Sequence, residues 1–141
     1  MTWEAALPFF SIEELADRET GELKLDDNFA AQLPALRQAW GRPLSPTSVC
    51  RSAITNAEVG GHPRSLHLIT NPVHPTTGSM AADIAWHDWS DQEQWAFFNL
   101  AKDLGWAVGL SDRFIQVDRR ADIGLPAVTY TYPDWDDRFA L

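Results

Sequence analysis

The middle of the chain reads Ser48-Val49-Cys50-Arg51-Ser52, then Asn56-Ala57-Glu58-Val59-Gly60-Gly61, then Ser65-Leu66-His67, and later Ala81-Ala82-Asp83-Ile84. An arginine, a histidine and an aspartate thus stand in or beside short apolar runs. Small apolar residues over 81–86 predict a strand, and 46–51 is typical of an extended segment. We therefore expect these polar groups to come from strands and from the loops that join them.

The segments between those motifs have the composition of turns and loops. Residues 56–63 contain Gly60-Gly61 and predict a turn, whereas 68–79 contain two prolines and a glycine and predict a loop. The single cysteine, Cys50, excludes an internal disulfide and is interpreted as a small buried residue.

Helix signals flank this central part. Ser11-Ile12-Glu13-Glu14 and Ser90-Asp91-Gln92-Glu93 are capping boxes, and each predicts a helix start. A second helix is expected after Asp26 or Asp27 and before Gly41, with a kink or a late start because of Pro34. Its apolar face is predicted to consist of Phe29, Leu33, Leu36 and Trp40.

The helix after Ser90 has the clearest pattern, and three strands are expected to follow it. Its predicted inner stripe is Phe97, Leu100, Ala101 and Leu104, and Gly105 should end it. The strand candidates are 106–108, 114–117 and 128–132. Four tryptophans lie near this helix in the sequence, and we expect them to be buried: Trp86, Trp89, Trp95 and Trp106. The order of elements predicts a single α+β domain over 1–141, with helices packed on a small, mainly antiparallel sheet.

Composition restricts the function. With 141 residues, 45% of them hydrophobic, the chain can bury a sizeable core. A net charge of −9 argues against nucleic acid as a partner, and no apolar run is long enough to predict a membrane span. Since the first residues lack the features of a signal peptide, we expect synthesis in the cytoplasm.

The central motifs together resemble the M15 family of zinc D-Ala-D-Ala peptidases, which includes many phage endolysins. The family pattern is roughly Ser-Gly-Tyr-Arg-Ser, Asn-x-x-Val-Gly-Gly, Ser-x-His-x-x-Gly-x-Ala-x-Asp and, near the C-terminus, His-Val-Asp. The resemblance covers about 9–132. Its outer parts are Phe10-Ser11-Ile12-Glu13-Glu14-Leu15, Leu36-Arg37, Trp40-Gly41 and Phe114-Ile115-Gln116-Val117-Asp118-x-Arg120. It implies the hedgehog-like fold of the DD-peptidases.

The resemblance also implies a site. His67 and Asp83 match two zinc ligands, and the third ligand position is Gln116. Arg51 and Ser65 match positions that lie beside the substrate, where an arginine can hold a terminal carboxylate. In this family the metal activates the water that attacks the scissile carbonyl.

Two further aspartates have expected roles, one of them with an alternative. Asp112, four residues before Gln116, is the candidate general acid/base, with an ordinary turn aspartate as the alternative interpretation. Asp118 matches the aspartate of His-Val-Asp and is expected to support the site.

The chain departs from the family pattern in two ways. A glutamine oxygen is a poorer zinc donor than an imidazole nitrogen, so Gln116 predicts weaker zinc binding. His67 and Asp83 lie sixteen residues apart, whereas the family places them seven apart, and Ser79 stands where the family has glycine. His74 in the inserted loop is a possible substitute ligand and ranks above His87.

Two functions follow as hypotheses. The first is a zinc metallopeptidase that acts on peptidoglycan stem peptides, as a D-Ala carboxypeptidase or an endolysin, and reaches the cell wall through lysis or in a phage particle. The second is an inactive protein of the same fold, serving as a virion component bound to other phage proteins or as a murein-binding module. Gln116 is the observation behind the second hypothesis.

Overall fold

The computed structural model describes residues 3–7 and 9–139 and has an α+β architecture, as predicted. Two short helical segments come first, η1 (Trp3–Ala6) and α1 (Ile12–Leu15). The longer helix α2 (Asp27–Trp40) follows them. Then follow β1 (Pro46–Ser48), α3 (Ala53–Glu58), β2 (Ala81–Ala85) and α4 (Asp91–Asp103). The chain continues through β3 (Ala107–Leu110), β4 (Phe114–Asp118), η2 (Arg120–Ile123) and β5 (Thr129–Thr131).

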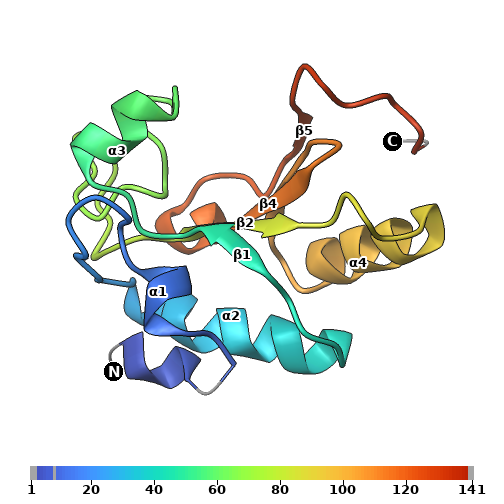
Figure 1. The fold of residues 1–141 in the computed structure, drawn as a ribbon, viewed down its shortest axis with the longest axis horizontal. Helices are drawn as coiled ribbons and strands as arrows, with labels where there is room; N and C mark the ends of the chain where they lie inside the picture. The colour runs from blue at the N-terminus through green and yellow to red at the C-terminus, as the bar shows by residue number, and fades with distance from the viewer. Residues whose placement is uncertain (1–2, 8, 140–141) are drawn as a thin grey trace.

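The five strands form one sheet in the order β1-β2-β4-β3-β5. Every neighbouring pair is antiparallel except β3 and β5, which are parallel. Figure 1 shows the sheet in the middle of the molecule, with α2 and α4 on one side of it and α3 beyond its β1 edge. The prediction of a mainly antiparallel sheet is confirmed.

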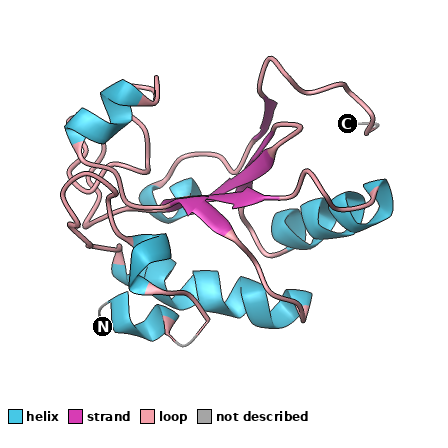
Figure 2. Ribbon diagram, viewed as in Figure 1, coloured by secondary structure: helices cyan, strands magenta, loops and turns pink. Residues whose placement is uncertain are grey.

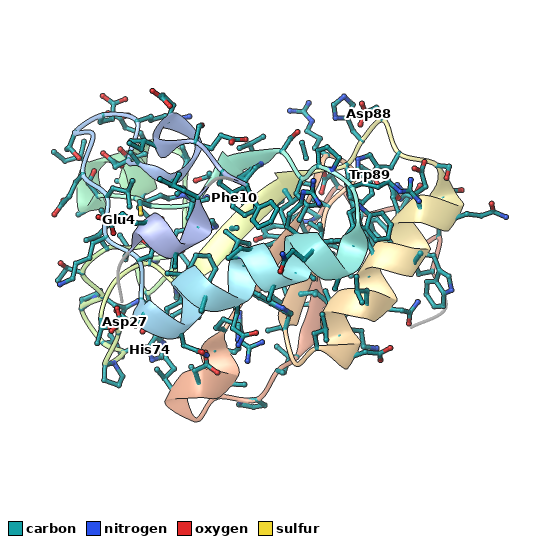
Figure 3. All side chains as sticks on the ribbon, turned by 90° about the horizontal axis from the view of Figure 1, so that it is seen from below. Glu4, Phe10, Asp27, His74, Asp88 and Trp89 are labelled. Atoms are coloured by element: carbon teal, nitrogen blue, oxygen red, sulfur yellow. The ribbon has the colours of Figure 1, made fainter. Side chains whose placement is uncertain are left out.

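One face of the sheet makes the core. Successive side chains of a strand point to opposite faces, and the core-facing set is Ala82, Ile84, Val108, Leu110, Ile115 and Val117. Helices α2 and α4 cover this face, and Figure 3 shows the two lying side by side. The opposite face is therefore left for polar side chains.

The predicted helix starts are confirmed in atomic detail. Both capping boxes form, with Glu14 and Glu93 each bonded back to the capping serine, and Asp26 caps α2. Helix α2 begins at Asp27 and includes Pro34, so of the two predicted outcomes, a kink or a late start, the late start is wrong. Phe29, Leu33 and Leu36 are fully buried, and this packing offsets the hydrogen bond that proline removes.

Three further predictions need correction. Residues Asn56–Glu58, predicted as part of a turn, form the end of helix α3. Leu104 and Trp95, predicted to be buried, are 43% and 42% exposed, because Phe98 takes an inner position of α4 instead. Cys50 is buried, as expected, and no helix in the described part of the chain is long and apolar enough to cross a membrane.

Candidate functional site

The polar face of the sheet carries one continuous row of residues in register. The pairings run from strand to strand across all five strands: Ser48, Asp83, Gln116, Gly109 and Tyr130. Paired residues of adjacent strands project from the same face. The row therefore brings Asp83 and Gln116, more than thirty residues apart in sequence, next to each other.

A groove lies over this row. Ser48, Asp83, Gln116 and Tyr130 line it. Gly109 does not, because the Tyr130 ring lies directly on it: a Cβ at Gly109 would be 2.5 Å from that ring. Glycine is thus required at this place by a close approach, and the groove has an aromatic side chain over strand β3.

His67 reaches the row from the long loop between α3 and β2, seen in Figure 2 as a pink segment. Its side chain is fully buried. The ring atom Nδ1 lies 2.8 Å from the carbonyl oxygen of Val49, and Nε2 lies 3.0 Å from Oδ1 of Asp83. The structure thus brings together His67 and Asp83, the two residues predicted as zinc ligands.

The hydrogen bonds of His67 decide which of its ring nitrogens carries a proton. A carbonyl oxygen only accepts hydrogen bonds, so Nδ1 carries a proton and donates it to Val49. In a neutral ring, Nε2 then presents a lone pair to the carboxylate oxygen of Asp83. Two acceptors 3.0 Å apart repel each other unless a proton or a metal ion lies between them.

The nine inserted residues do not separate His67 from Asp83, because hydrogen bonds close the loop at its base. Ile69 N–H donates to Arg51 O, Met80 N–H donates to Leu66 O, and the Ser79 hydroxyl donates to His67 O at 2.7 Å. The extra length is therefore closed off at its base, and Ser79 takes a structural role where the family pattern has glycine.

Arg51 lies beside Asp83 at the centre of the groove. Its Nη2 donates to Asp83 Oδ2 at 2.9 Å, its Nε to Ser48 Oγ at 2.9 Å, and its Nη1 to Asn56 Oδ1 at 3.2 Å. Burial lowers the pKa of Arg51, while the charge of Asp83 acts in the opposite direction. A guanidinium has five N–H donors, so two remain for a bound anion.

Gly61 allows this arrangement of Arg51 and Asn56. A Cβ at Gly61 would lie 2.8 Å from Arg51 Nη1 and 2.0 Å from Asn56 Oδ1. The backbone of the Gly60-Gly61 turn therefore packs directly on the groups that position the arginine. This contact gives the glycine pair of the sequence motif a physical reason.

Gln116 is held by neighbours on both sides. The Tyr132 hydroxyl donates to Gln116 Oε1 at 2.8 Å, and Gln116 Nε2 donates to Asp118 Oδ2 at 3.3 Å. Arg120 in turn donates two hydrogen bonds to the fully buried Asp118 carboxylate. The amide is thus oriented with its oxygen toward Tyr132 and its nitrogen toward Asp118.

Sequence reasoning did not single out Tyr132. Burial raises its pKa, so its hydroxyl stays protonated and donates to the amide oxygen. The sequence did contain a signal: Tyr130 and Tyr132 are two residues apart, and this spacing places both rings on one face of a strand.

The remaining predicted residues lie around this centre. Ser65 Oγ accepts a hydrogen bond from His67 N–H and so shapes the loop that presents the histidine. Asp112 lies in the turn before β4, where Arg138 Nη1 binds its Oδ1 at 3.0 Å. His74 and His87 also line the groove, His87 in the exposed turn after β2.

His67, Asp83 and Gln116 offer only some of the donor atoms that a divalent metal prefers. Among residues 3–7 and 9–139, no three His, Cys, Asp or Glu side chains are placed to hold a metal ion together. His74 accordingly does not join His67 and Asp83. His67 Nε2 and Asp83 Oδ1 are zinc donors of the usual kind, and a third donor at this place would be the amide oxygen of Gln116. These residues fit a metal site that is weaker than one with three imidazole or carboxylate ligands.

Comparison with known proteins gives one match. A sequence model of the family described as Peptidase M15 matches residues 9–118. No curated protein and no solved structure gives a significant match to the chain. The matched segment contains Arg51, His67, Asp83 and Gln116.

Proposed function

The chain belongs to the peptidase M15 family, and we propose that its groove binds peptidoglycan stem peptides and cleaves them with the help of a zinc ion. The observation that carries this proposal is the cluster of His67, Asp83 and Arg51 in the centre of the groove. Zinc held by His67, Asp83 and the oxygen of Gln116 would supply a water of lowered pKa and polarise the scissile carbonyl.

The protein's own groups have defined tasks in this proposal. Arg51 binds the terminal carboxylate of the peptide with the two N–H groups that have no partner among the described residues. Val49 fixes the tautomer of His67, and Tyr132 fixes the amide of Gln116. These contacts hold the donor atoms in place before the substrate arrives.

Asp112 is the residue we propose for proton transfer. It lines the groove, and Arg138 binds Oδ1. Oδ2 has no hydrogen-bond partner among the described residues, so it can take a proton and return it to the leaving amine. Asp112→Asn would then lower kcat and leave peptide binding unchanged.

Digestion of purified murein tests the activity. The protein is incubated with intact murein and zinc, and mass spectrometry detects free D-alanine and new amino termini. His67→Ala and Arg51→Gln serve as matched controls, since the first removes a metal donor and the second the carboxylate donor. If the parent releases neither product, the peptidase proposal is wrong.

The orientation of Gln116 supports a second candidate, a protein that binds stem peptides without cleaving them. Its amide oxygen is already engaged by Tyr132, and an amide is a weak zinc donor. Such a protein would act as a murein-binding module or as a component of a phage particle. Binding of a stem peptide that stays intact in the presence of zinc, with affinity lost in Arg51→Gln, is the result expected for this candidate.

A further inference from the structure

The groove differs in charge from the rest of the molecule. Five of the eleven basic residues line it, but only four of the twenty acidic ones, so its formal charge is +1 and that of the remaining chain is −10. The basic residues are Arg18, Arg51, Arg64, Arg113 and Arg120, and the acidic ones are Glu13, Glu14, Asp83 and Asp112.

Most of the acidic charges in the groove already have partners. Asp83 pairs with Arg51, Asp112 with Arg138, and Glu14 belongs to the capping box of α1. By contrast, the guanidinium groups of Arg18, Arg64 and Arg113 have no hydrogen-bond or ion-pair partner within the part of the chain that the structure describes. The groove therefore has an excess of uncompensated positive charge.

The three arginines come from separate segments with fixed backbones. Asp17 accepts three hydrogen bonds from Glu19 and Thr20 and closes the turn that carries Arg18. Arg64 N–H donates to His62 Nδ1, and Arg113 N–H donates to Ser111 Oγ. The three side chains are exposed. The hydrogen bonds just described hold the backbone at each of the three residues in place.

Arg18 lines the same groove as Arg51. An exposed arginine without an internal partner in an acidic protein favours an anion beside it.

We propose that Arg18, Arg64 and Arg113 form an outer binding region that selects peptides with free carboxylates besides the terminal one. This inference rests on the proposed function and adds the substrate class: stem peptides whose third residue is a diamino acid with its own free carboxylate. The strongly negative remainder of the molecule disfavours long polyanions, so a short acidic peptide is the ligand that suits the groove.

Binding of three synthetic pentapeptides tests this inference. All have the form L-Ala-γ-D-Glu-X-D-Ala-D-Ala, where X is meso-diaminopimelate, the same residue with its side-chain carboxylate amidated, or L-lysine. Affinity is measured by calorimetry, or as kcat/KM if the peptide is cleaved. We expect the free carboxylate to bind about fivefold more tightly than the amide at low salt, and this preference to shrink at about 0.5 M salt.

Variants identify the residues responsible. Arg18→Gln, Arg64→Gln and Arg113→Gln are made singly and together, and the triple variant should lose the preference. Arg42→Gln, an exposed arginine that does not line the groove and pairs with Glu93, should keep it. Circular dichroism confirms that each variant is folded.

The outcomes separate this inference from the proposed function. Equal binding of the three peptides by the parent, or a preference that persists in the triple variant, overturns the outer region and leaves the proposed function standing. Failure of all three peptides to bind overturns the proposed function and the inference with it.

Discussion

Gln116 is the residue on which the chemistry of the site depends. It stands between Asp83 on β2 and Gly109 on β3 in the register of the sheet. Tyr132 and Asp118 fix both ends of its amide. A side chain held in this way loses little conformational entropy on binding a ligand, so its weakness as a metal donor is one of chemistry and not of placement.

Replacing Gln116 by histidine should therefore strengthen metal binding. An imidazole nitrogen at this place would complete a set of two histidines and one carboxylate, and we expect zinc affinity to rise about tenfold or more. Competition with a chromophoric chelator measures the change. Gln116→Asn, which shortens the amide, is the control. A Gln116→His variant that binds zinc no better than the parent would mean that this position does not face the metal.

Asp17 connects the start of the chain to the segment that carries Arg51. Asp17 is 1% exposed, and its Oδ1 accepts the N–H of Ser52, the residue after Arg51. Burial alone would raise the pKa of Asp17, but the hydrogen bonds from Ser52, Thr55 and Thr20 together hold it well below its usual range.

The lowered pKa of Asp17 predicts a loss of stability in acid. A depressed folded-state pKa gives stabilisation that is complete above the unfolded pKa of about 3.9 and is lost as pH falls below it. Asp17→Asn should cost about 2 kcal/mol at pH 7, and the difference from the parent should narrow at pH 3. Urea unfolding at both pH values measures this. The exposed Asp88→Asn should change little, and a constant difference for Asp17→Asn would refute the role given to its charge.

At the level of elements, caps and apolar spacing predicted the helices well wherever the signal was local. Both serine capping boxes and the αL residue Gly41 at the end of α2 are examples. Helix α3 was missed because its support is not local: Ser52 caps it, but Ser52 is itself held by Asp17, which is 35 residues away in sequence. The continuity of α2 through Pro34 likewise follows from burial, which the sequence does not display.

The capping box of α4 should contribute measurably to stability. Ser90 Oγ accepts the N–H of Glu93, and the Glu93 carboxylate accepts the N–H of Ser90. Ser90→Ala should lower the free energy of unfolding by about 1 kcal/mol and speed amide hydrogen exchange in the first turn of α4. Ser90→Thr keeps the hydroxyl and should retain most of the stability. If both substitutions have the same effect, the cap is not the cause.

At the scale of the whole molecule, the C-terminal segment closes the aromatic part of the core. Trp135, which follows β5, packs inward between exposed aspartates: it is 6% exposed and stacks on Trp86 with ring centroids 6.1 Å apart. Phe139 contacts both rings. A run of acidic residues around Trp135 concealed this in the sequence.

Removing the Trp135 ring should destabilise the protein more than removing an exposed tryptophan. We expect Trp135→Ala to cost about 3 kcal/mol. Trp95→Ala, at a side chain 42% exposed, should cost about 1 kcal/mol. Midpoints of urea unfolding give both values. Equal losses would show that the C-terminal segment does not belong to the cooperative core.

The site itself was predictable as a set of residues but not as an arrangement. Ordered motifs indicated Arg51, His67, Asp83 and Gln116, and the structure brings them to one face of the sheet. Tyr132 and the closure of the inserted loop could not be predicted, because both depend on contacts between distant segments. That position 116 carries an amide and not an imidazole could be read directly from the sequence.

Zinc content tests the central claim most directly. The parent, His67→Ala and Gln116→His are equilibrated with a slight excess of zinc, freed of unbound metal and measured by elemental mass spectrometry. Our account predicts about one zinc per chain in the parent and in Gln116→His, and a marked loss in His67→Ala, because His67 and Asp83 are the retained donors. A parent that holds no more zinc than His67→Ala would contradict it.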